Sequence, residues 1–224
     1  NVLNWSVNHP KIPNIELKNQ DLRGLNFEYV NLSNSDFAWS NLGNTKISNV
    51  NFTQANLSHT DLSGKDLTGT ILTGADLSGA KLVGVDISGK DLTGTILTGA
   101  DLSGKDLTGT ILTGADLSDA ILTGADLTGK DLTGTILINA NLENAVLINT
   151  ILNCVDHPVC DHLGLSGVDL VGMDFSNAYL AGIDLTGKDI TGTILTGADL
   201  SDAILTGADL TGKDLTRTIL AGAD

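Results

Sequence analysis

The chain has 224 residues, and its 27 acidic residues against 12 lysines and arginines give a formal net charge of −15 at pH 7. This charge argues against direct binding of nucleic acid, because contacts to phosphate groups need lysine and arginine. Hydrophobic residues make up 41% of the chain and aromatic residues only 4%, a balance that favours a narrow core of stacked aliphatic side chains.

No run of about 18 apolar residues is present, so we expect no membrane-spanning segment. No secretory signal peptide is visible at the start of the sequence. The sequence begins at Asn1 and ends inside a repeat, so a longer parent protein is an open alternative.

Residues 1–14 do not follow the pattern of the rest of the chain and contain Trp5, Pro10 and Pro13. A stacked repeat array needs a cover over its first layer. We therefore expect an N-terminal cap in which Trp5 lies over the end of the core.

From residue 15 onward every fifth residue is apolar, and the fifteen-residue sequence Gly64–Ser78 recurs unchanged at Gly89–Ser103 and Gly104–Ser118. A period of five fits neither an amphipathic helix nor an alternating strand. We predict a square coil in which each pentapeptide forms one side. The central Leu and the residue two before it point inward, and Gly takes a corner that needs a positive φ.

The pattern Ala-Asp-Leu-Ser/Thr-Gly at Ala75–Gly79, Ala100–Gly104 and Ala125–Gly129 resembles the pentapeptide-repeat proteins. The resemblance covers about residues 15–224 and implies an all-β fold, a right-handed quadrilateral parallel β-helix. Four pentapeptides form each coil of about 20 residues, which gives about ten coils here. The resemblance implies little about activity, because this fold serves many functions.

The five-residue period slips by three residues after Leu152. Thr110–Leu137 and Thr193–Leu220 match except for Gly134 and Arg217, and they are separated by four coils plus three residues. We expect one domain, with β-helix over residues 15–152, an inserted loop over 153–164 and the same β-helix continuing over 165–224.

Two surface patterns recur from coil to coil, and both are candidate partner-binding sites. The acidic row consists of Asp66, Asp86, Asp106, Asp126, Asp169, Asp189 and Asp209. The isoleucine stripe consists of Ile71, Ile111, Ile151 and Ile194, which alternate with Asp on the intervening coils. A solvated polar face and recent duplication are the alternatives for these patterns.

Lysine occupies inward positions at Lys65, Lys90, Lys105, Lys130, Lys188 and Lys213. Burial of an unpaired ammonium is costly. We expect each stem to pack against the leucine stack while the ammonium reaches an Asp or a backbone carbonyl between coils.

The predicted loop contains both cysteines, Cys154 and Cys160, together with His157 and His162. A Cys154–Cys160 disulfide is our main prediction for an oxidising compartment, with free thiols or a metal site as alternatives. The bacterial cytoplasm is favoured as the location, and the disulfide would instead indicate export. We predict no metal ion and no cofactor.

The sequence therefore predicts a non-enzymatic scaffold that presents rigid acidic faces to a protein partner. Some pentapeptide-repeat proteins resemble B-DNA in shape and charge and protect DNA gyrase. The resemblance thus implies an alternative function, a DNA mimic that binds this type II topoisomerase through the acidic row. A homodimer is also an open alternative. Convex repeat faces offer no substrate cleft, so we expect no enzymatic activity.

Overall fold

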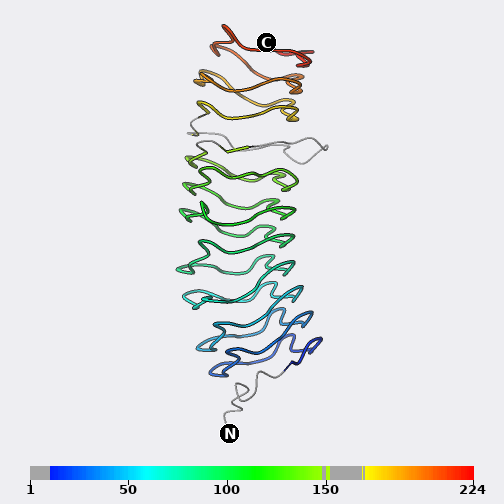
Figure 1. The fold of residues 1–224 in the computed structure, drawn as a ribbon, viewed down its shortest axis with the longest axis vertical. Helices are drawn as coiled ribbons and strands as arrows, with labels where there is room; N and C mark the ends of the chain where they lie inside the picture. The colour runs from blue at the N-terminus through cyan, green and yellow to red at the C-terminus, as the bar shows by residue number, and fades with distance from the viewer. Residues whose placement is uncertain (1–10, 148–149, 152–167, 169) are drawn as a thin grey trace. The chain divides into compact units, whose positions relative to one another are not determined.

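The computed structural model describes residues 11–147, 150–151, 168 and 170–224. Contacts divide the chain into two compact units. Unit 1 comprises Asn1–Asp101 with Gly109–Asp116, and unit 2 comprises Leu102–Thr108 with Leu117–Asp224. Within each unit the chain winds through successive coils (Figure 1). The predicted cap at residues 1–14 falls mostly outside the described residues, as does the loop at 153–164.

The described residues form no helix and no strand longer than an isolated bridge. Within them, no helix is long and apolar enough to cross a membrane. The bridges are parallel, and all but Ile151↔Asp174 join residues one coil of twenty apart, such as Asn31↔Asn51 in unit 1 and Asp106↔Asp126 in unit 2. Each coil is therefore built from four pentapeptides, as the sequence period predicts.

Each pentapeptide has the same five positions, which we call inward, outer, central, turn and corner. Ala75, Asp76, Leu77, Ser78 and Gly79 provide one example. The inward and central residues are buried, with Ala75 and Leu77 almost fully shielded from solvent. The corner residue has a positive φ at every described corner except Gly109, and its value is 60° at Gly79. Glycine adopts this conformation readily, whereas Asn, Tyr29, Trp39 and His59 take it at corners nearer the N-terminus.

Backbone hydrogen bonding explains why this short unit is stable. In the example, all five N–H groups have acceptors: Leu72 O for Ala75 at 2.9 Å, Ala55 O for Asp76 at 2.9 Å, Ile96 O for Leu77 at 2.7 Å, Asp76 Oδ1 for Ser78 at 2.9 Å, and Thr98 O for Gly79 at 3.2 Å. Three of these bonds join neighbouring coils, one closes the turn, and one comes from the outer side chain. The pentapeptide thus leaves no N–H unsatisfied, a strong requirement for any ordered backbone.

Stacked central residues fill the core of each unit. Phe27, Phe37 and Phe52 pack edge to face in unit 1, with ring centroids 6.1 Å apart for the first pair and 5.5 Å for the second. Leucines continue this stack in both units. Small inward residues such as Ala100 lie beside them, fully buried.

The phase shift after Leu152 is visible in unit 2 as a change in bridge spacing. Ile151 pairs with Asp174, three residues more than one coil away, and the next bridges return to a spacing of one coil. The coils on either side therefore pair in phase, as the matching segments of the sequence predict.

Candidate interaction surface

The acidic row is part of the turn structure as well as a set of surface charges. Five of its described members are exposed, and Asp126 is half-buried. In each described member Oδ1 accepts a hydrogen bond from the N–H two residues later, as in Asp66 with Thr68 at 2.8 Å and Asp189 with Thr191 at 2.8 Å. The same bond is made by Asp86, Asp106, Asp126 and Asp209. Asp169 lies outside the described residues.

These turn bonds also favour the ionised carboxylates. Hydrogen bonds from the Thr68 side chain and backbone hold the pKa of Asp66 below its usual value. Thr191 and Thr211 lower the pKa of Asp189 and of Asp209 in the same way. At Asp189 the charge of Asp209 acts in the opposite sense, but it is the weakest of the contributions. Asp66, Asp189 and Asp209 are therefore anionic groups near neutral pH.

The isoleucine stripe occupies outer positions, where most coils have Asp or Asn. Ile71 and Ile111 in unit 1 are 47% and 50% exposed, and Ile151 and Ile194 in unit 2 are similarly open to solvent. Isoleucine cannot accept a turn hydrogen bond. As a result, the N–H groups of Thr73 and Thr113 have no acceptor in the described part of the chain.

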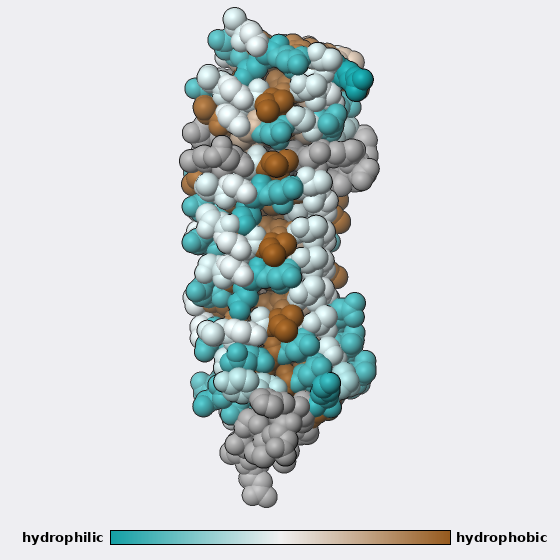
Figure 2. All heavy atoms as spheres, viewed as in Figure 1, coloured by the Kyte–Doolittle hydropathy of each residue, from teal (hydrophilic) through white to brown (hydrophobic). Residues whose placement is uncertain are grey.

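The described coils contain further exposed apolar groups that the single stripe did not include. Ile96 in unit 1 and Ile219 in unit 2 lie on the neighbouring face, one corner further along the chain. Figure 2 shows a face on which hydrophobic side chains alternate with hydrophilic ones. The signal was already in the sequence, because an outer Ile follows each of the six inward lysines by six residues.

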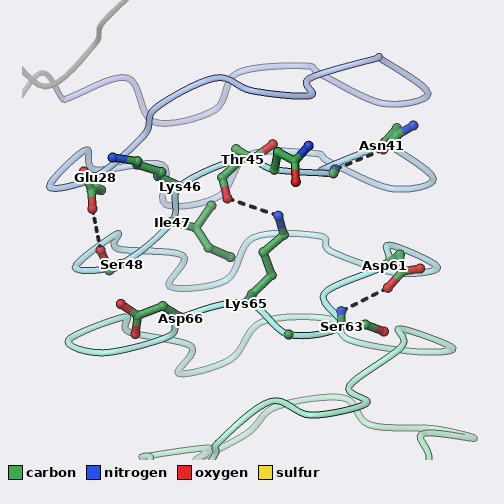
Figure 3. A pocket seen from close by; sticks show the side chains of 13 residues that line it. Glu28, Asn41, Thr45, Lys46, Ile47, Ser48, Asp61, Ser63, Lys65 and Asp66 are labelled. Carbon is green, nitrogen blue, oxygen red and sulfur yellow. Dashed lines mark hydrogen bonds between the residues drawn. The ribbon is translucent and has the colours of Figure 1, made fainter.

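The inward lysines donate to backbone carbonyl groups of the preceding coil. Lys65 Nζ donates to Thr45 O at 3.1 Å (Figure 3). Lys90 Nζ reaches Leu67 O and Thr70 O, and Lys213 Nζ reaches Ile190 O and Thr193 O. Lys188 donates to Val168 O at 3.3 Å. The predicted contact with backbone carbonyls is confirmed at these four lysines.

Backbone N–H and C=O groups of neighbouring coils form a ladder of hydrogen bonds. The lysine ammonium opens this ladder on one side of the lysine. Among the described residues, Asp91 N–H does not bond Thr70 O, and Leu72 N–H does not bond Asp91 O. The equivalent pairs are also missing at Lys65 and Lys213. On the far side of Lys90 the ladder is intact, with Ile111 N–H bonding Lys90 O at 2.9 Å. Burial lowers the pKa of Lys65 and of Lys90, and neighbouring Asp carboxylates partly offset that effect.

Shallow polar grooves lie at these openings. One groove of about 680 Å³ surrounds Lys65 and is lined by Glu28, Lys46, Asp61 and Asp66 (Figure 3). Grooves of about 360 Å³ and 240 Å³ contain Lys90 and Lys213. Their walls carry mixed charges and few apolar groups, unlike the mostly apolar pockets that hold small molecules.

An aromatic pair at one corner of unit 1 was missed in the sequence. Trp39 and His59 stack with ring centroids 3.9 Å apart and planes 18° apart, and Trp39 is 58% exposed. Both are corner residues one coil apart, and that spacing is the signal that would have indicated the contact.

Within the described ranges, no group of three or more His, Cys, Asp or Glu side chains is arranged to hold a metal ion. The predicted Cys154–Cys160 disulfide and the neighbouring histidines lie outside the described residues. The disulfide therefore stays a prediction.

The sequence model of the family described as pentapeptide repeats matches the chain in eight copies. The matches cover residues 14–49, 51–89, 91–129, 125–156 and 184–222. The chain belongs to the pentapeptide repeat family. The resemblance seen in the sequence is thereby confirmed, and a solved structure of the same family supports a β-helical repeat fold.

Several pentapeptide repeat structures are similar to this chain. HetL, involved in heterocyst differentiation regulation in the cyanobacterium Nostoc sp. strain PCC 7120, is 34% identical, with a TM-score of 0.59 over 96% of this chain and 89% of HetL. A thylakoid lumen protein of Arabidopsis thaliana is 30% identical over 46% of this chain and 69% of its own, with a TM-score of 0.35. QnrB1, a plasmid-mediated fluoroquinolone resistance protein, is 17% identical over 94% of this chain and 82% of its own, with a TM-score of 0.33. No match was found among curated protein sequences.

Proposed function

We propose that this protein is a non-enzymatic scaffold that binds a protein partner through its exposed repeat faces. The observation that carries the proposal is isoleucine at outer positions. An Asp there would complete the turn, as Asp76 does, and would favour contact with water. Ile71 and Ile111 instead leave the turn N–H without an acceptor and expose about half of their surface. Apolar groups kept in a row at such a cost commonly mark a contact surface.

The double variant Ile71→Asp/Ile111→Asp tests this proposal. If the two isoleucines serve binding, their replacement adds turn hydrogen bonds and leaves the free energy of unfolding within about 0.5 kcal/mol of the wild type or above it. Urea unfolding followed by circular dichroism measures this quantity. Capture of partner proteins from a cell lysate, compared between the two forms, should decrease in the variant.

The matched control is Ile87→Asp, because Ile87 is a buried central residue of the same unit. A buried carboxylate without a partner is strongly destabilising. A loss of stability in Ile71→Asp/Ile111→Asp as large as in Ile87→Asp would show that the stripe is structural and would contradict the proposal.

A DNA mimic that binds gyrase is the second candidate, and the acidic row supports it. Turn hydrogen bonds hold its carboxylates in one repeated conformation. In unit 2, Asp106 and Asp126 pair directly on neighbouring coils. A gyrase supercoiling assay with and without a quinolone tests this candidate, using Asp106→Asn/Asp126→Asn as the charge-removing variant. Equal binding to gyrase by the variant, or no protection by the wild type, would eliminate it.

We further propose that the coils are right-handed and four-sided, and that about ten of them make up the chain. The support is the spacing of the bridges and the turn closing each pentapeptide. A crystal structure tests both the handedness and the coil count.

A further inference from the structure

Three exposed isoleucines and three exposed or half-buried aspartates of unit 1 form a zigzag around one corner of the coil. Each of three successive coils places one isoleucine and one aspartate on opposite sides of this corner, and the two types exchange sides from one coil to the next. The pairs in chain order are Ile71 with Asp76, Asp91 with Ile96, and Ile111 with Asp116. Bridges join Asp76 to Ile96, Ile96 to Asp116 and Asp91 to Ile111, so these residues are neighbours on adjacent coils.

The corner position between the two sides is occupied by glycine on all three coils, next to a turn threonine, and the Gln54 side chain lies against the first of these glycines. Gly74, Gly94 and Gly114 occupy it, each with φ between 62° and 68°. A partner can therefore approach the backbone closely at Gly94 and Gly114, where no side chain lies against the glycine, as glycine permits wherever a chain must come near a ligand. The apolar groups on either side are open to it, with Ile96 39% exposed.

We propose that this zigzag binds a basic amphipathic helix from another protein. The proposal rests on the scaffold function above and names the chemistry of the partner. The axis of the partner helix runs along the corner. The apolar side chains of the helix contact Ile71, Ile96 and Ile111 in turn. Its Lys or Arg side chains form ion pairs with Asp76, Asp91 and Asp116.

The spacing supports a helix in particular. Neighbouring coils lie about 4.8 Å apart, so successive isoleucines advance by that distance and change sides each time. Apolar residues in a heptad repeat advance by about 5.3 Å on average and also alternate between two sides of a seam. The mismatch of about 0.5 Å per step stays small over three coils.

Charge supports a basic partner. The whole chain has a net charge of −15, and the zigzag itself contains no lysine or arginine. Turn hydrogen bonds hold Asp76 and Asp91 in place, through Ser78 N–H at 2.9 Å and Thr93 N–H at 3.0 Å. Asp116 accepts a hydrogen bond from Thr98 Oγ1 on the preceding coil at 3.3 Å.

Unit 2 has a related zigzag that provides an internal comparison. Its coils pair Asp174 with Tyr179, Ile194 with Asp199, and Asp214 with Ile219. However, its corner carries Asn177 and Arg217 beside Gly197. A cationic side chain at this corner would repel a basic helix and block its approach, so we assign the site to unit 1.

The substitution Gly94→Arg reproduces in unit 1 the corner residue of unit 2. Arg217 adopts φ of 61°, so arginine is compatible with this backbone, and a Cβ on Gly94 would meet only Gly74 Cα at 4.0 Å. The matched control is Gly84→Arg at another corner of unit 1, where φ is 67° and the nearest atoms are also 4.0 Å away.

The probe is a fluorescent synthetic peptide of about three heptads, with leucine at the a and d positions and lysine outside. Its control is a peptide of the same composition with the leucines scrambled. Fluorescence anisotropy at physiological salt should show tighter binding of the heptad peptide. Gly94→Arg should weaken that binding about tenfold or more, Asp91→Asn should weaken it less, and Gly84→Arg should leave it near the wild-type value.

Equal binding of the scrambled peptide, or equal effects of the two arginine variants, would overturn the helix proposal. So would a lack of binding by the heptad peptide. The scaffold function is judged separately, by the stability and the partner capture of Ile71→Asp/Ile111→Asp. If those results are as expected while the peptide fails to bind, only the helical partner is rejected.

Discussion

At the scale of single residues, the outer aspartates have two roles that the sequence does not separate. Their charges face solvent, and their Oδ1 atoms complete the hydrogen bonding of the turn. Asparagine makes the same bond at other coils, as Asn51 does with Thr53 N–H at 2.8 Å. The turn therefore requires an oxygen acceptor at this position and does not require a charge.

Asp76 provides a direct test of the turn bond. Asp76→Ala removes the acceptor for Ser78 and should lower the free energy of unfolding by about 1 kcal/mol. Asp76→Asn retains a side-chain oxygen and should cost clearly less. Chemical unfolding of both variants measures the difference. An equal loss in the two variants would show that the charge, and not the hydrogen bond, stabilises this turn.

The lowered aspartate pKa values predict acid sensitivity. A carboxylate whose pKa is lower in the folded state than in the unfolded state binds fewer protons when folded. It contributes stability above its ordinary pKa of 3.8, and that contribution is lost as the pH falls through the lower folded value. We expect the free energy of unfolding to decrease progressively below about pH 4.

A pH series of urea unfolding curves checks this expectation. The variant Asp189→Asn/Asp209→Asn serves as the control, because it removes two of the responsible groups and should flatten the decrease. Carboxylates titrate between about pH 5 and about pH 2. A free energy of unfolding of the wild type that stays constant over this range would contradict the argument.

At the scale of the pentapeptide, the sequence predicted most of the backbone. The five-residue period located buried centres such as Leu77, inward positions such as Ala75 and corners such as Gly79. These features repeat in register, so they are visible as periodicity. The hydrogen bond that Asp76 accepts in the turn was not predicted. A polar residue at the outer position looks the same in the sequence whether it accepts this bond or only faces solvent.

The partner surface was predicted less completely than the fold. The isoleucine stripe was found by comparing residues on one face, which included Ile71 and omitted Ile96 across the corner. The effect of lysine on the ladder was also missed. A sequence shows that Lys90 points inward, but it does not show which carbonyl its ammonium takes from the backbone.

Replacing an inward lysine by threonine should close the ladder. Thr95, one pentapeptide after Lys90, has an intact ladder beside it, in which Ile96 N–H bonds Ala75 O and Leu77 N–H bonds Ile96 O. In Lys90→Thr, Asp91 N–H and Leu72 N–H should gain the equivalent bonds. Their amide hydrogen exchange should slow, and the free energy of unfolding should rise by about 1 kcal/mol.

Lys81→Thr is the control for this experiment. Lys81 is an exposed outer residue 3.8 Å from Asp61, so its loss leaves the inward positions unchanged. Exchange at Asp91 and Leu72 should not respond to it. Unchanged exchange at these amides in Lys90→Thr would mean that the lysine is not the cause of the opening.

At the scale of the whole molecule, the net charge of −15 is the dominant electrostatic feature. Ion pairs within 4 Å join Arg23 to Asp21 and Lys81 to Asp61 among the described residues, but the 27 acidic residues far outnumber the 12 lysines and arginines. Excess charge of one sign keeps a protein soluble and destabilises the compact state through self-repulsion.

Salt should therefore stabilise the protein. Raising the ionic strength from about 0.01 M to about 0.15 M shortens the screening length from about 30 Å to about 8 Å. If screening restores about 1 kcal/mol, Tm rises by about 2–4 °C for a chain of this size. Thermal unfolding followed by circular dichroism, in both NaCl and KCl, measures the shift. A Tm that falls with either salt would contradict the dominance of self-repulsion.

The pairing of Ile151 with Asp174 has a consequence for protein engineering. Three extra residues between these coils leave the register on both sides unchanged. The pairing of Ile151 with Asp174 therefore tolerates a change in the length of the chain that connects them. The entropic cost of closing a loop rises only slowly with the length of the loop. We therefore expect the chain between Ile151 and Asp174 to be a suitable insertion site. A tag, an epitope or a small domain can be added there without changing the repeat sequence.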